Sequence, residues 1–265
     1  MTRVKKLLVV AALASAAGAV PALAQAIPAP PPPVAVAHAT ADPTPLTATA
    51  ESRELALKLT QLINSEAATR AMVDRMLKET LQPALAQDPL FRELEKRSPG
   101  ASAEFVSVMT PIILETLSAK MPEYQQTTSI IYAKWLTADD LRTTLAFYAS
   151  PAGTRLRNAL TEHADFKVSL TKQIASLGQE DLTAGDVRAD IASSARTAVS
   201  VLTSEDQAAL IQFASRVDMA KFNRANAEIA EMTANWGNNI DPQTQRKIEV
   251  AIAALMERRL AEKKQ

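Results

Sequence analysis

The sequence predicts an all-α protein, a helical bundle or array with two related helical units that follows a signal peptide and a proline-rich tether. Only 6 of the 265 residues are glycine and 4% are aromatic. Beyond residue 52 the apolar residues recur three and four positions apart, which is helical spacing. The roughly 210 residues of 52–263 can bury a sufficient core. They must do so by packing alone, because the chain contains no cysteine. We therefore expect one all-α domain over residues 52–263.

Residues 1–24 have the layout of a secretory signal peptide. Three basic residues precede an apolar run, and a small-x-small cleavage site ends at Ala24. The alternative, a transmembrane anchor, needs about 20 apolar residues, and the run at 7–20 is shorter. We expect cleavage after Ala24 and export to the periplasm. With no cysteine to carry a lipid, the mature protein is expected to be soluble.

Residues 25–51 are rich in proline and alanine, and 27–45 hold seven of the fifteen prolines. This composition predicts a disordered, extended tether without a packed core. The alternative is a ligand for a proline-binding module. Removal of residues 1–24 takes three basic and no acidic residues, so the mature net charge is about −3. That balance argues against nucleic acid as a partner, and the mature chain carries no strong membrane signal.

The first helices of the domain are expected where apolar stripes meet capping residues. Stripes at 55–63 and 72–81 flank Ser65, which is a suitable N-cap. Asp88-Pro89 can start a further helix, and the RSPG segment at 97–100 is a break. A long apolar stretch then runs from residue 105 to 135. Its two prolines, Pro111 and Pro122, either kink one helix or divide two.

Two segments sixty-six positions apart align without gaps. LTADDLRTTLAFYASPAGTRL begins at Leu136 and LTSEDQAALIQFASRVDMAKF begins at Leu202. Phe147 aligns with Phe213, Arg155 with Lys221, and an acidic pair occurs near the start of each segment. The shared register predicts an approximate internal repeat over residues 115–180 and 181–246.

The stretch FYASPAGTR, residues 147–155, predicts a sharp corner between two helices. Thr137 is a suitable N-cap for the helix before it, with acidic residues in the first turn. Ser150 caps the next helix, Pro151 fits its first position, and Gly153 allows another backbone to approach closely. The second copy lacks this Ser-Pro-Gly chemistry at residues 216–219, so a softer bend is expected there.

This pattern resembles the bacterial exported family catalogued as domain of unknown function twenty-fifty-nine. The matching positions are Leu136, Thr137, Asp140, Leu141, Phe147, Tyr148, Ser150, Pro151, Gly153 and Arg155, with Tyr132 and Trp135 upstream. The resemblance is specific over roughly residues 130–160 and faint elsewhere. The family often has glutamate where this chain has Asp139 or Asp140. The resemblance implies an all-helical protein with a signal peptide and no established activity.

No catalytic, cofactor-binding or metal-binding site is predicted. A hydrolase built on Ser150 and His163 is the weakest hypothesis, because the acidic neighbours of His163 do not share its helix face. A zinc site needs three or four ligands and the chain has two histidines. Residues 237–245 lack the spacing of a calcium loop. They predict a helix end at Gly237 and a new start at Asp241-Pro242.

The expected function is therefore that of a non-enzymatic exported helical protein that works through contact with another protein of the cell envelope. The alternative is a periplasmic protein that holds an apolar ligand or lipid between its helices. An exposed apolar groove would favour the first function, and a closed apolar cavity of several hundred Å³ the second. The sequence names neither the partner nor the ligand, and it leaves the oligomeric state open.

Overall fold

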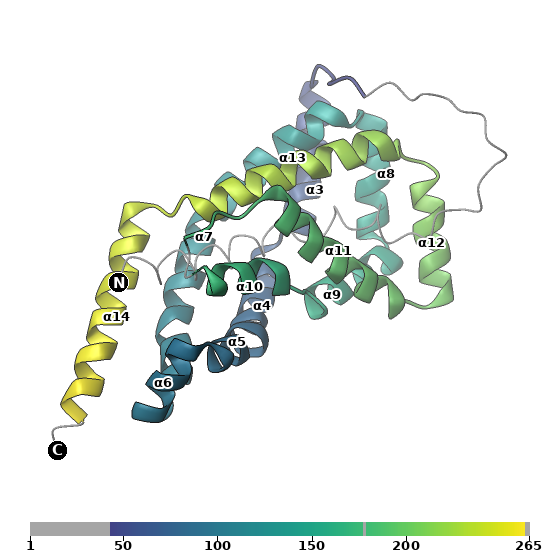
Figure 1. Ribbon diagram of the computed structural model, residues 1–265. Coiled ribbons are helices and arrows are strands. Elements are labelled where there is room, and N and C mark those ends of the chain that lie inside the picture. The colour runs from purple at the N-terminus through teal and green to yellow at the C-terminus, as the bar shows by residue number, and fades with distance from the viewer. Residues whose placement is uncertain (1–42, 177–178, 263–265) are drawn as a thin grey trace.

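A computed structural model describes residues 43–176 and 179–262 as helices joined by short turns, with no strand among them (Figure 1). This confirms the all-α prediction. The signal peptide at 1–24 and most of the tether lie outside the described residues. The helices are α3 (Ala50–Ile63), α4 (Glu66–Arg75), the π-helix η1 (Met76–Leu81), α5 (Gln82–Gln87), α6 (Pro89–Arg97), α7 (Ala101–Trp135), α8 (Ala138–Ala149), α9 (Pro151–Glu162), α10 (Lys167–Ala175), α11 (Ala184–Ser200), α12 (Ser204–Ala214), α13 (Met219–Asn238) and α14 (Pro242–Glu262).

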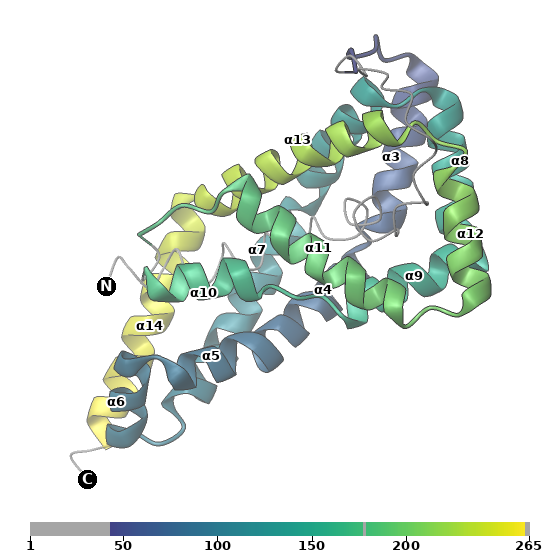
Figure 2. The same ribbon diagram turned by 45° about the vertical axis from the view of Figure 1, so that its right-hand side comes forward.

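The 35-residue helix α7 is the longest element, about 50 Å from end to end. It follows Gly100, whose φ of 84° is a left-handed conformation that favours glycine. Pro111 and Pro122 both lie within this single helix, so neither proline divides it. Helices α3, α13 and α14 pack along α7, and their contacts hold together a helix that two prolines weaken locally (Figures 1 and 2).

Side-chain caps set most of the helix starts. Ser65 accepts a hydrogen bond from the amide of Ala68, as predicted. Thr49 forms a capping box with Ser52 and starts α3 at Ala50. The amide of Leu46 donates to the carbonyl oxygen of Lys134, 2.7 Å away. The folded body therefore begins a few residues before the predicted boundary at residue 52, because the cap lies outside the apolar stripe that marked it.

The second corner is longer than the first, in which Ser150 alone separates α8 from α9. Helix α12 ends at Ala214, residues 215–218 form a turn, and Asp218 caps α13 by accepting from the amides of Ala220 and Lys221. Asp218 thus supplies the cap that the lost serine would have provided, and the softer bend expected here stays a prediction. Further on, α14 starts at Pro242 as predicted, while α13 ends at Asn238, one residue beyond Gly237.

A π-helical turn joins α4 to α5 for a local chemical reason. Pro83, at the start of α5, has no N–H to donate to the carbonyl four residues earlier. The amide of the preceding residue, Gln82, donates to the carbonyl oxygen of Leu77, five residues back rather than four. This spacing is the hydrogen-bond pattern of a π-helix. The side chains of Met76, Leu77 and Leu81 remain buried through this turn.

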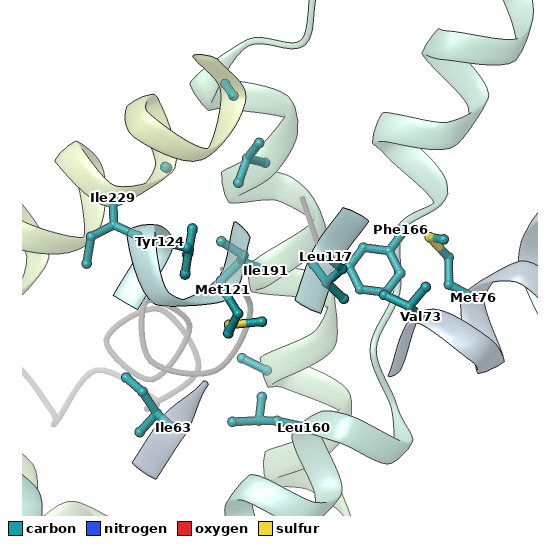
Figure 3. Close-up of a cluster of buried hydrophobic side chains, with 14 of the residues drawn as sticks. Ile63, Val73, Met76, Leu117, Met121, Tyr124, Leu160, Phe166, Ile191 and Ile229 are labelled. Carbon is teal, nitrogen blue, oxygen red and sulfur yellow. The ribbon is translucent and has the colours of Figure 1, made fainter. Parts of the chain in front are cut away.

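The hydrophobic core runs continuously through the described helices. Figure 3 shows part of it, with side chains from helices that are far apart in the sequence converging on α7. The labelled residues are Ile63, Val73, Met76, Leu117, Met121, Tyr124, Leu160, Phe166, Ile191 and Ile229. All of them are 6% exposed or less. The residues of both aligned segments therefore contribute to one core rather than to two.

Candidate functional site

The corner between α8 and α9 is a close backbone approach. The Ser150 hydroxyl accepts from the amide of Gly153 at 3.1 Å and donates to the carbonyl oxygen of Phe147 at 2.6 Å. A Cβ on Gly153 would collide with that carbonyl oxygen and lie 2.6 Å from the Cα of Tyr148. Pro151 occupies the first turn of α9. Ser150, Pro151 and Gly153 therefore act together to seat the start of α9 on the end of α8.

The two aromatic residues of the motif are both buried, and both contact Phe213 of α12, Phe147 by stacking and Tyr148 edge-on. Tyr148 is fully buried, and this burial raises the pKa of its hydroxyl well above the ordinary value. Phe147 stacks on Phe213 of α12, with ring centroids 4.5 Å apart and an angle of 12° between the planes. This stack joins the first aligned segment to the second.

Helices α8 and α12 run side by side in opposite directions, as Figures 1 and 2 show. At one end, the amide of Asp218, just beyond α12, donates to a carboxylate oxygen of Asp140 in the first turn of α8. At the other end, Arg155 of α9 reaches Asp206 in the first turn of α12. These contacts hold the two helices antiparallel over their whole length.

The ion pair between Arg155 and Asp206 is bidentate. The guanidinium Nε and Nη2 donate to the two carboxylate oxygens at 2.8 and 2.6 Å. The Asp206 side chain is only 2% exposed, whereas that of Arg155 is about half exposed. The hydrogen bonds from Arg155 hold the pKa of the Asp206 carboxyl below its ordinary value. The last residue of the motif thus ties the first segment to the second.

An open groove of about 520 Å³ lies between α8 and α12, beside the stacked rings. Its lining residues are Arg142, Thr143, Ala146, Phe147, Ser150, Ala209, Gln212, Phe213 and Arg216. Eight of these nine form four pairs of residues sixty-six positions apart, namely 143 with 209, 146 with 212, 147 with 213, and 150 with 216. The groove therefore has approximate local two-fold symmetry, with the Phe147–Phe213 stack at its centre.

The charges of the groove break this symmetry. Because the helices are antiparallel, Arg142 near the start of α8 and Arg216 just after the end of α12 lie at the same end. No carboxylate lines the groove. Arg142 donates to Glu51 at 2.7 Å and also to Asp139, and these hydrogen bonds raise the pKa of its guanidinium. Arg216 is exposed and forms no ion pair with the residues that the structure describes.

The motif residues separate into two groups. Phe147 and Ser150 line the groove. The others position helices: Thr137, Asp140, Leu141, Tyr148, Pro151, Gly153 and Arg155. Sequence reasoning missed the half of the groove that α12 and its following turn contribute, which includes Ala209, Gln212 and Arg216. The sixty-six-residue alignment is the signal that could have located it, because it pairs these residues with Thr143, Ala146 and Ser150.

The hydrolase and metal sites considered from the sequence do not form among the residues that the structure describes. Ser150 caps the start of α9 and His163 follows its end, so about 18 Å of helix separates them. They do not converge as a nucleophile and base would. Over residues 43–176 and 179–262, no group of three or more histidine, aspartate or glutamate side chains is placed to hold a metal ion.

A small cavity of about 10 Å³ lies beside a buried carboxyl group. Asp190 of α11 is 3% exposed and accepts from the amides of Val168 and Ser169 at 2.9 and 3.0 Å. It therefore caps α10 from a neighbouring helix. Burial raises the pKa of Asp190 to about 6, and the nearby charge of Asp165 adds to the rise.

The chain matches no protein-family model, no curated protein and no solved structure. Its resemblance to an exported helical family thus stays a prediction. In the part of the chain that the structure describes, no helix combines the length and apolarity needed to span a bilayer.

Proposed function

We propose that this is a non-enzymatic exported protein that works by contact with another protein of the cell envelope, and that the groove between α8 and α12 is the contact surface. The observation that supports this most directly is the groove itself. It is open to solvent, it measures about 520 Å³, and two stacked aromatic rings line its centre. The two rings are 9% and 4% exposed, so they form the floor of the groove, and aromatic residues are enriched at the centres of protein–protein contact sites.

The alternative, a carrier of an apolar ligand or lipid, has less support. Ligand cavities usually measure about 300–1,000 Å³ and enclose most of the ligand surface. The cavity beside Asp190 holds about 10 Å³, the space of one water molecule. A hollow of about 350 Å³ between α7 and the start of α14 is open, and charged residues such as Glu115, Lys120 and Asp241 line it. Neither offers an enclosed apolar volume.

The exported location in this proposal rests on residues 1–24. It is tested by expressing the full chain in a Gram-negative host and sequencing the N-terminus of the protein released by osmotic shock. The expected first residue is Gln25. A chain that keeps Met1 and remains with the cytoplasm would contradict export, and it would leave the groove argument unaffected.

The contact surface is tested by site-specific photo-crosslinking in the protein's own host. A photoreactive phenylalanine analogue replaces Ala146, which is exposed and lines the groove. The control position is Ala254, which is exposed on α14. We expect a protein adduct of one discrete mass from position 146 and none from position 254. The adduct should disappear when Ala209→Trp fills the groove.

Three outcomes would contradict the proposal. The first is no protein adduct from position 146. The second is the same adducts from both positions, and the third is an adduct that survives Ala209→Trp. An adduct that adds the mass of a lipid would support the alternative function instead.

A further inference from the structure

We infer that the occupant of the groove is an extended segment of the partner protein that presents an apolar side chain next to an acidic one. The apolar side chain lies on the Phe147–Phe213 stack, and the carboxylate lies between Arg142 and Arg216. This inference rests on the proposed function and deepens it by naming the chemistry of the partner.

The charge of the occupant follows from the difference between the two ends of the groove. The local two-fold pairs Arg216 with Ser150 and Arg142 with Ala208. Glu51 and Asp139 already pair with Arg142, so Arg216 is the cation that this end offers, and the opposite end has only small, uncharged residues at the equivalent positions. A guanidinium pairs with a carboxylate through two parallel hydrogen bonds, which gives orientation as well as affinity. An acidic residue is thus favoured at one end only.

The two arginines differ in what they can offer. Glu51 and Asp139 already receive hydrogen bonds from Arg142, and they hold its side chain in place at the mouth of the groove. Arg216 is exposed and has no ion-pair partner among the described residues, so its hydrogen-bond donors are available. The carboxylate of the occupant is therefore expected to pair mainly with Arg216.

A peptide fits the lining better than a fatty acid, although both carry a carboxylate. The side chains of Thr143 and Gln212 interrupt the apolar floor, and each can donate and accept hydrogen bonds. A peptide backbone presents one N–H and one C=O at nearly every residue, and these groups require partners when they are covered. A hydrocarbon chain would instead leave the polar side chains of the groove covered and unpaired.

The test uses peptides as probes and the mature chain as the target. A phage-displayed library of random heptapeptides is selected on the wild-type protein, and the most enriched sequence is synthesised with a fluorescein label. Its dissociation constant is then measured by fluorescence polarisation. We expect enriched peptides to contain Asp or Glu within two positions of Leu, Ile, Met or Phe.

Charge reversal then locates the carboxylate. Arg216→Glu is expected to weaken the labelled peptide about tenfold or more, since it replaces attraction by repulsion. Arg246→Glu is the matched control, because Arg246 is also exposed but lies on α14, and it should leave the affinity unchanged. Changing the acidic residue of the peptide to lysine should weaken binding to the wild type and restore binding to Arg216→Glu. Thermal melts of both variants confirm that they fold.

Several results would overturn the inference. They are a selection without binders, enriched peptides without acidic residues, and an affinity that Arg216→Glu leaves unchanged. Decanoate that displaces the peptide at a comparable concentration would assign the groove to a fatty acid instead. These failures are distinguishable from failure of the proposed function. If position 146 still crosslinks to one protein, the groove remains a contact surface and only the partner chemistry is wrong.

Discussion

Phe147 stacks on Phe213, the residue that the sequence alignment makes its own equivalent. A residue that touches its own equivalent lies on a local two-fold axis. One exchanged pair of contacts follows the same operation, α7 on α13 and α9 on α11, whereas the close packing of α8 on α9 has no comparable counterpart between α12 and α13. We propose on this basis that residues 115–180 and 181–246 arose by duplication, and that the two copies pack face to face.

The aromatic stack is expected to couple the two copies energetically. In a double-mutant cycle of Phe147→Leu and Phe213→Leu, we expect a coupling free energy of about 1 kcal/mol, because the stacked geometry adds to simple burial. Urea unfolding of the four proteins measures it. A cycle of Phe147→Leu with Phe91→Leu is the control, since Phe91 contacts Phe105 in another region. Additive losses in the first cycle would show that the stack is only incidental packing.

The ion pair between Arg155 and Asp206 should matter more than a surface pair. Arg155→Ala removes the two guanidinium donors of a buried carboxylate, whereas Arg142→Ala breaks contacts between exposed groups. We expect the melting temperature to fall by several degrees for Arg155→Ala and to change little for Arg142→Ala. Equal effects would contradict the buried character of Asp206.

The same pair has a pH signature. Since the folded-state pKa of Asp206 is lowered, its contribution to stability is present above the ordinary carboxyl pKa and is lost as the pH falls through the lower folded-state value. The difference in melting temperature between wild type and Arg155→Ala should therefore shrink on acidification from pH 7 to pH 3. A difference that stays constant over this range would count against the assignment.

Gly153 is expected to tolerate no side chain. Its Cβ would meet fixed backbone atoms of α8, so Gly153→Ala should destabilise the protein by about 3 kcal/mol, at the upper end of overpacking costs. Gly185→Ala is the matched control in the first turn of α11, where the nearest atom to an added Cβ is the Thr183 hydroxyl at 3.4 Å. That change should be neutral or stabilise by up to about 1 kcal/mol. Similar effects of the two substitutions in chemical denaturation would refute the close approach.

Asp190 should make stability depend on pH in the opposite sense to Asp206, because its pKa is raised rather than lowered. Its folded-state pKa of about 6 lies above the ordinary value of 3.8, so the folded state binds this proton more tightly than the unfolded chain. The contribution is complete below the ordinary value and is lost as the pH rises through 6. Relative to Asp190→Asn, the wild type should lose up to about 3 kcal/mol of unfolding free energy between pH 4 and pH 7. Urea unfolding of both proteins at both pH values measures this loss. If the difference in unfolding free energy between wild type and Asp190→Asn does not change with pH, the Asp190 carboxyl is exposed to solvent rather than buried.

The helix starts could be predicted from the sequence because they depend on neighbouring residues. The groove could not be predicted, because it depends on packing between helices that are distant in the sequence. Thr137 and Ser150 cap the helices that directly follow them, so short sequence windows were sufficient. The groove forms only when α12 reaches α8, and no short window contains both. Pro111 and Pro122 show the same limit, because the continuity of α7 depends on helices that pack against it from elsewhere in the chain.

The near-symmetry of the groove bears on the direction in which a bound chain would run. A symmetric groove would accept an extended peptide in both orientations, and here the two arginines supply the difference in charge between its ends. Placing one arginine at the opposite end, with Ala208→Arg beside Arg142→Ala and Arg216→Ser, should reverse the peptide polarity without changing the Phe147–Phe213 stack or the Ser150 cap. A spin label at one terminus of the peptide would then approach the other mouth of the groove. The orientation of the bound peptide would then be determined by surface substitutions alone.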